Sequence, residues 1–97
     1  MLKWAFLFVH SDADSKKSRA TVNTPTSGMT VVGVKDFNEA ANTKSLVDEG
    51  VKFIELCGGF GPVGTAKVLE AVGDKVPVGS VSYGIESMES FLALLKE

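Results

Sequence analysis

Cysteine and histidine are nearly absent from this chain of 97 residues, which holds one of each. A single cysteine excludes an internal disulfide and fits a reducing compartment such as the cytoplasm. One cysteine and one histidine do not supply the usual ligands of a zinc site, so we expect no metal. The sequence leaves the identity of any cofactor open.

The chain also lacks a large net charge of either sign. Ten lysines and arginines stand against 12 aspartates and glutamates, which gives a formal net charge of −2. This balance favours neither a nucleic-acid binder nor a membrane-surface protein. The apolar run of residues 4–9 is too short to span a bilayer, and no cleavage pattern typical of a signal peptide follows it. We therefore expect a cytoplasmic protein that binds neither nucleic acid nor membrane.

Apolar residues, by contrast, are plentiful. They make up 44% of the chain, enough to build one hydrophobic core, and the length suits one domain over residues 1–97. A domain this small leaves much of its apolar surface near solvent. We therefore expect a homo-oligomer, with a dimer favoured.

The order of the predicted elements indicates an α/β fold. Strands are predicted at residues 3–10, 29–34, 51–57 and 76–83, and helices at 36–49, 62–72 and from 85 onward. This alternation favours a mostly parallel four-stranded sheet with about three helices in a single small domain. Residues 20–24 could add an edge strand.

Two of these elements carry a prediction about burial. The first strand is apolar at every position from 4 to 9, which predicts a strand buried on both faces. In the last helix, Ile85, Met88, Leu92 and Leu95 recur at helical spacing and predict a buried stripe.

The carboxyl ends of parallel strands are where ligands bind in such sheets. Four segments are expected there: residues 10–12, 35–36, 57–59 and 82–84. Their side chains are the candidates for a functional site. Of the last segment, Ser82 and Tyr83 are candidate ligand contacts, although Tyr83 could equally pack against the protein.

The glycine turn after the third strand is the most informative motif. Gly59, Gly61 and Gly64 match G-x-G-x-x-G between a strand and a helix, which suits an anion held by backbone N–H groups. The acidic residue that a dinucleotide site requires at the end of the next strand is missing. We therefore expect Gly58, Gly59, Phe60 and Gly61 to bind a small phosphate- or carboxylate-bearing ligand. The alternative is a tight turn that needs glycine for its geometry alone.

Three further residues raise the question of catalysis. Cys57 precedes a helix N-terminus, a position that can activate a thiol as a nucleophile, but a small buried side chain explains it too. Alternation places Glu55 on the same strand face as Cys57, where it could act as a base, form a salt bridge or lie at an exposed sheet edge. His10 ends the first strand and could assist or be purely structural.

The loop after the first strand carries a small basic cluster, Lys16, Lys17 and Arg19. A run of this kind is usually a solvated surface. The alternative is that it attracts an anionic ligand.

The run Glu-Leu-Cys-Gly-Gly-Phe-Gly-Pro at residues 55–62, with Lys-Trp-Ala-Phe at 3–6, resembles a family of short bacterial proteins of unknown function. The resemblance covers nearly the whole chain and implies no activity. Three functions stay open: binding of a small anionic ligand, a small enzyme, and a structural or partner-binding homo-oligomer.

Overall fold

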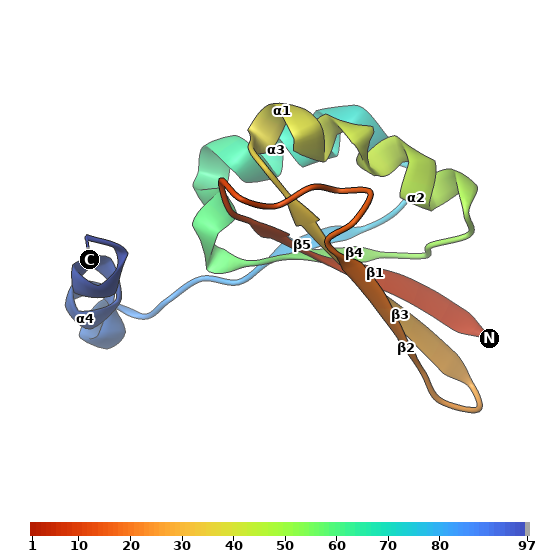
Figure 1. Ribbon diagram of the computed structural model, residues 1–97, viewed down its shortest axis with the longest axis horizontal. Helices are drawn as coiled ribbons and strands as arrows, with labels where there is room; N and C mark the ends of the chain where they lie inside the picture. The colour runs from red at the N-terminus through yellow and green to blue at the C-terminus, as the bar shows by residue number, and fades with distance from the viewer. Residues whose placement is uncertain (97) are drawn as a thin grey trace.

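The fold was described from a computed structural model that covers residues 1–96 (Figure 1). The strands are β1 (Leu2–Val9), β2 (Arg19–Asn23), β3 (Ser27–Val34), β4 (Ile54–Leu56) and β5 (Val78–Ser80). The helices are α1 (Phe37–Ala40), α2 (Lys44–Asp48), α3 (Gly61–Val72) and α4 (Ile85–Leu95), with short 3-10 turns η1 (Ala41–Thr43) and η2 (Gly58–Phe60).

The strands form one sheet in the order β2-β3-β1-β4-β5. β1 runs parallel to both β3 and β4, and β4 runs parallel to β5. Only β2 is antiparallel, and it pairs with β3 at the edge. The predicted α/β class, the four parallel strands and the additional edge strand near residues 20–24 are confirmed. The predicted helix at 36–49 is divided into α1, η1 and α2.

The direction of the crossovers explains why α1, α2 and α3 all lie on one face of the sheet (Figure 1). The chain passes from β3 to β4 through α1 and α2, and from β4 to β5 through α3, moving the same way across the sheet both times. Right-handed crossovers that advance in one direction place their helices on the same face. Neither crossover helix can therefore cover the opposite face.

The hydrophobic core lies between the sheet and these helices. Ala5 and Leu7 of β1 are fully buried. The core is completed by Val32, Val34, Ala40, Leu46, Val51, Ile54, Leu56, Phe60, Val68, Val72 and Val76. Core side chains on each strand alternate with side chains that point to the other face, as strand geometry requires.

The opposite side of the sheet, called here the open face, is also apolar. It consists of Leu2, Trp4, Phe6, Phe8, Ala20, Val22, Met29, Val31 and Phe53, assigned from strand register and alternation. Trp4, Phe6 and Phe8 are only partly buried, and Val22 is 60% exposed. The prediction that the first strand is buried on both faces is therefore wrong, because no helix among residues 1–96 covers the open face.

The last helix, α4, stands apart from the rest of the domain (Figure 1). No residue from Ile85 to Leu95 is buried, and Ile85 is 92% exposed. The predicted buried stripe is thus wrong for the isolated chain: the residues have helical spacing, but they face solvent. Among residues 1–96, no helix is long and apolar enough to cross a membrane.

Candidate functional site

The carboxyl ends of β1, β3, β4 and β5 lie at one rim of the sheet, since these strands are parallel. Val9, the last residue of β1, has its Cγ1 atom 3.1 Å from the position of a Cβ atom at Gly59. The backbone N–H of Val81 donates to the carbonyl of Leu56 at 2.9 Å and carries the chain from β5 toward Ser82. The ends of the strands therefore meet at the rim, as predicted.

The fold itself accounts for three glycines of the turn region, two through packing and one through its backbone conformation. A Cβ atom at Gly58 would stand 2.8 Å from the Tyr83 ring, and one at Gly64 would stand 2.8 Å from the Phe37 ring. Gly61 has φ of +58°, a conformation that favours glycine. Each glycine is thus needed by the fold itself. The ligand contacts predicted at this turn stay a prediction.

Phe60 has a structural place in the same turn. Its side chain is 1% exposed and stacks on Phe37 with ring centroids 5.8 Å apart. A ligand at the rim could therefore meet the backbone of Phe60 but not its ring.

One feature of the turn does favour an anion. The N-terminus of α3 has no side-chain cap, and Pro62 occupies its first turn. The first N–H groups of a helix lack intrahelical partners, which leaves those of Gly61 and Val63 without one in α3. They carry the positive end of the helix dipole.

The three residues considered for catalysis differ in their surroundings. Glu55 pairs with Phe6 on the open face and is exposed, although β4 is an interior strand and not the sheet edge that the sequence left open. His10 is 64% exposed, and its Nδ1 atom accepts the backbone N–H of Asp12 at 3.1 Å. Cys57 is half-buried. The catalytic roles of Glu55, His10 and Cys57 stay predictions.

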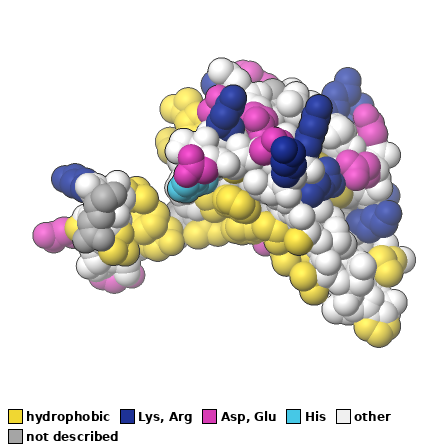
Figure 2. All heavy atoms as spheres, in the orientation of Figure 1, with side chains coloured by type: hydrophobic (Ala, Val, Ile, Leu, Met, Phe, Trp, Pro, Cys, Tyr) yellow, Lys and Arg dark blue, Asp and Glu magenta, His cyan; other side chains and the backbone are white. Residues whose placement is uncertain are grey.

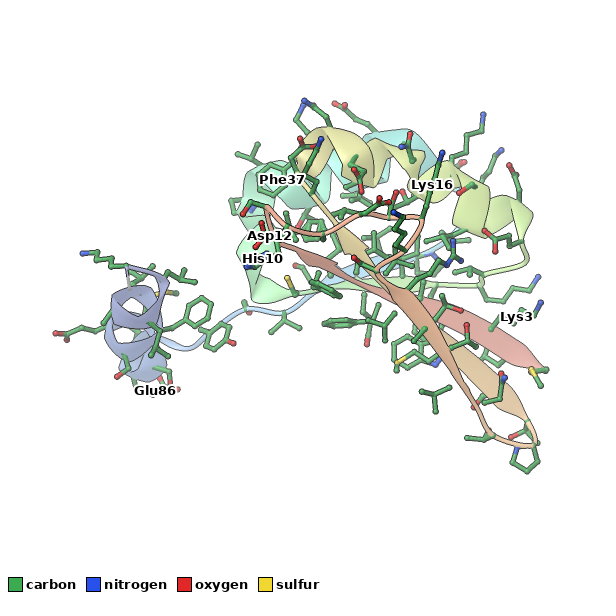
Figure 3. The ribbon with its side chains drawn as sticks, viewed as in Figure 1. Lys3, His10, Asp12, Lys16, Phe37 and Glu86 are labelled. Atoms are coloured by element: carbon green, nitrogen blue, oxygen red, sulfur yellow. The ribbon has the colours of Figure 1, made fainter. Side chains whose placement is uncertain are left out.

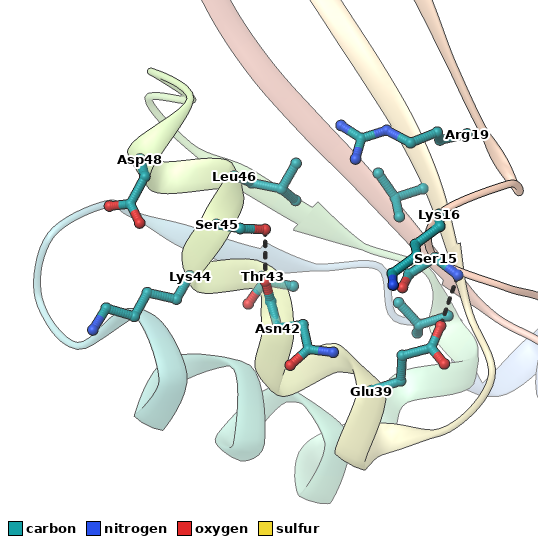
Figure 4. A pocket seen from close by; sticks show the side chains of 12 residues that line it. Ser15, Lys16, Arg19, Glu39, Asn42, Thr43, Lys44, Ser45, Leu46 and Asp48 are labelled. Atoms are coloured by element: carbon teal, nitrogen blue, oxygen red, sulfur yellow. Dashed lines mark hydrogen bonds between the residues drawn. The ribbon is translucent and has the colours of Figure 1, made fainter.

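A cleft of about 630 Å³ lies elsewhere, between the loop after β1 and the segment from α1 to α2 (Figure 4). We call it the Arg19 cleft. Its apolar lining comes from Val32, Val34 and Leu46. Its polar lining consists of Ser15, Lys16, Arg19, Glu39, Asn42, Thr43, Lys44, Ser45 and Asp48.

The lining of the Arg19 cleft carries three cations, Lys16, Arg19 and Lys44, and two carboxylates, Glu39 and Asp48. The side chains of Lys16 and Arg19 extend from one wall toward the helices, whereas Lys44 and Asp48 point outward (Figure 4). Arg19 makes one contact, at 3.4 Å, with a carboxylate oxygen of Glu49. Because a guanidinium has five N–H donors, Arg19 keeps donors for a ligand.

The acidic side chain inside the cleft, Glu39, is engaged by backbone groups. Its Oε1 atom accepts the N–H of Ser15 at 2.8 Å and that of Lys35 at 3.4 Å. Asp36 caps α1 by accepting the N–H of Glu39 at 2.8 Å, at the position where the sequence predicts a helix to begin. These bonds fix the loop that carries Lys16 against α1.

The Arg19 cleft was not predicted from the sequence. Its walls come from residues 15–19 and 39–48, which are separate in the chain and meet only because β2 turns back along β3. The one sequence feature that pointed to the cleft is the basic cluster of Lys16, Lys17 and Arg19. Of these three residues, Lys16 and Arg19 line the cleft and Lys17 does not. Over residues 1–96, no group of three or more histidine, cysteine or acidic side chains is placed to hold a metal ion.

Comparison with known proteins gives one match. Residues 2–96 match the model of a family described as "Family of unknown function (DUF6506)". No curated protein matches the chain. No solved structure matches it either.

Proposed function

Because the chain belongs to this family of unknown function, its own geometry must suggest its role, and we propose that it binds a small anionic ligand in the Arg19 cleft. The observation that carries the proposal is the inward direction of Lys16 and Arg19 over an apolar floor (Figure 4). Cations suit a carboxylate or phosphate, and apolar side chains suit the rest of a small organic molecule.

The size and composition of the cleft support this ligand class. Pockets for small molecules typically measure about 300–1,000 Å³ and combine an apolar lining with a few polar groups. The Arg19 cleft has about 630 Å³ and three apolar residues, Val32, Val34 and Leu46, beneath its basic side chains. The expected ligand is therefore amphipathic, with one acidic head and a compact apolar part.

The electrostatic argument favours the cleft over the glycine turn. The sequence prediction of an anionic ligand rested on residues 58–64, but packing already requires Gly58 and Gly64 there, and the backbone conformation favours glycine at Gly61. Full positive charges are present in the cleft, whereas the turn offers only the partial charge of a helix end. The uncapped N-terminus of α3 keeps the turn as a second candidate for the same class of ligand.

An NMR titration distinguishes the two locations. The ¹⁵N-labelled chain is titrated separately with inorganic phosphate, benzoate and a short-chain fatty acid. Binding in the cleft shifts the amide signals of Arg19, Asn42 and Leu46 in a saturable way and leaves Gly59 unchanged. Shifts centred on Gly59 and Val63 would instead locate the ligand at the turn, and the absence of saturable shifts with every probe would refute both.

A matched pair of variants tests the charge requirement. Arg19→Ala removes a cation from the cleft, and Lys17→Ala removes one from the preceding loop, outside the cleft. We expect Arg19→Ala to weaken binding about 10- to 100-fold, because a charged hydrogen bond contributes about 1.5–3 kcal/mol. Lys17→Ala should change affinity less than about 2-fold, as expected for a screened surface charge. Equal losses in both variants would contradict the proposed site.

A further inference from the structure

The chain presents two apolar surfaces that it does not cover itself. One is the open face of the sheet, and the other is the apolar side of α4. In the space-filling view, apolar side chains form a band along the sheet and continue on the side of α4 that faces the domain (Figure 2). Contiguous apolar surfaces of this extent mark interaction sites.

The apolar residues of α4 form one stripe. At 100° per residue, Ile85, Met88, Phe91, Leu92 and Leu95 fall within about 120° of arc. Ser90 lies on the opposite side of the helix. Ile85, Leu92 and Leu95 are 92%, 47% and 63% exposed. An isolated helix of 11 residues is marginal in water, so α4 needs a surface to pack on.

The helix α4 does not pack on the open face of its own chain, because the segment between β5 and α4 leads away from the sheet. Val81 extends β5 by bonding to Leu56. Tyr83 then lies over Gly58 at the rim and stacks on Phe91 with ring centroids 4.2 Å apart. These contacts hold α4 beyond the rim of the sheet (Figures 1 and 3).

The exposed area matches what a dimer would bury. The chain exposes 6341 Å², whereas a folded monomer of 10.3 kDa is expected to expose about 5,400 Å². The surplus, roughly 1,000 Å² per chain, is close to the ~800 Å² that each partner buries in an interface of standard size. A second copy of the chain can cover both apolar surfaces, because its α4 can pack on the open face of the first copy and its open face can receive the α4 of the first copy.

We propose that two copies of this chain form a dimer in which each α4 lies on the open face of the partner. The arrangement is reciprocal, so a two-fold axis closes it without leaving an unpaired surface. α4 is about 16 Å long and fits over β1 and β3, whose eight residues span about 26 Å. In this arrangement α4 packs on Trp4, Phe6, Met29 and Val31 of the partner. Glu55 on β4 lies at the edge of the interface.

The first test is the mass of the intact chain in solution, by analytical ultracentrifugation. We expect a dimer of 10.3 kDa chains. Leu92→Glu on α4 and Phe6→Glu on the open face each place two charges in the interface, because the symmetry repeats them. Each should raise the dimer dissociation constant at least about 100-fold, in line with losing a buried apolar side chain in both halves. The matched control Ser90→Glu, on the polar side of α4, should leave the constant within a few-fold.

The second test distinguishes helix exchange from other dimers. In a Cys57→Ser background, Met88→Cys and Val31→Cys are made as separate chains, with an affinity tag on one of them. The two chains are refolded together and treated with a flexible bismaleimide. Helix exchange joins the two different chains covalently, while each variant alone stays uncoupled.

Two outcomes would overturn the proposal. A monomeric mass at micromolar concentration overturns the dimer. A dimeric mass with coupling only between two Val31→Cys chains means that open faces pack on each other and overturns the exchange. Phe6→Glu and Leu92→Glu act on different surfaces, so the failure of one to fold leaves the other informative.

Discussion

The ring of Tyr83 lies directly on Gly58: a Cβ atom added to that glycine would come within 2.8 Å of the ring carbon Cε1. Tyr83 follows β5 and Gly58 follows β4, so the contact joins the ends of two neighbouring strands. The same ring stacks on Phe91 of α4, with an interplanar angle of 13°. One side chain therefore links the glycine turn to the last helix.

Removing this link should destabilise the protein. We expect Tyr83→Ala to lower the free energy of unfolding by about 1–2 kcal/mol, because a ring that is 41% exposed loses its remaining buried apolar area. Tyr83→Phe keeps the ring and should unfold like the parent chain. The measurement is urea denaturation at a fixed protein concentration, and equal midpoints for the two variants would contradict the role of the ring.

The sequence predicted local structure well because local chemistry determines it. The start of α1, for example, is determined by Asp36, which accepts the backbone N–H of Glu39 at 2.8 Å. The parallel strands followed from the alternation of apolar runs and helices. That alternation also predicted that the strand ends at His10 and Cys57 lie at the same rim.

Burial was harder to predict because it depends on contacts between distant segments. Phe6 and Leu7 are equally apolar in the sequence, yet only Leu7 meets the helices. Which face is covered depends on the strand order, and the strand order depends on how residues 11–28 return to form β2. For the same reason, the approach of Arg19 to α2 could not be derived from either segment alone.

The contact between Gly64 and Phe37 sets two effects against each other. Alanine at position 64 favours the helix by up to about 1 kcal/mol over glycine, but its Cβ atom would stand 2.8 Å from the Phe37 ring. That ring also stacks on buried Phe60, and overpacking of this kind typically costs about 1–3 kcal/mol. We expect a net loss of about 1–2 kcal/mol for Gly64→Ala.

The same helix offers a control for the propensity term. Ala66 is exposed on α3, so Ala66→Gly measures the difference between alanine and glycine without new packing. Both variants are compared by urea unfolding. If Gly64→Ala proves more stable than the parent chain, Phe37 has room to move and the packing explanation of this glycine fails.

Glu39 should hold one wall of the Arg19 cleft in place. Glu39→Ala removes the acceptor for the N–H groups of Ser15 and Lys35. We expect a loss of about 1–2 kcal/mol in stability, typical of hydrogen bonds to a charged group that is partly buried. The amide of Ser15 should also exchange its hydrogen faster. Glu39→Gln retains an acceptor oxygen and should retain most of the protection, whereas identical behaviour of the two variants would show that the carboxylate does not order the loop.

Thr43 carries a buried polar atom that lacks a partner among the described residues. Its side chain is 3% exposed, and its Oγ1 atom has no hydrogen bond. A buried hydroxyl that loses its bonds to water carries a desolvation penalty of about 1–3 kcal/mol. Thr43→Val has the same shape, replaces the hydroxyl by a methyl group and keeps the packing of η1 against α3. We therefore expect Thr43→Val to raise the free energy of unfolding by about 1 kcal/mol.

Thr43→Ser provides the opposite change at the same position, because it keeps the hydroxyl and removes the methyl group. It should lower stability by about 1 kcal/mol through lost apolar burial. Urea unfolding monitored by the fluorescence of Trp4 measures both variants. If Thr43→Val were less stable than the parent chain, the hydroxyl would have to be bonded in solution, and the explanation from an unsatisfied group would be withdrawn.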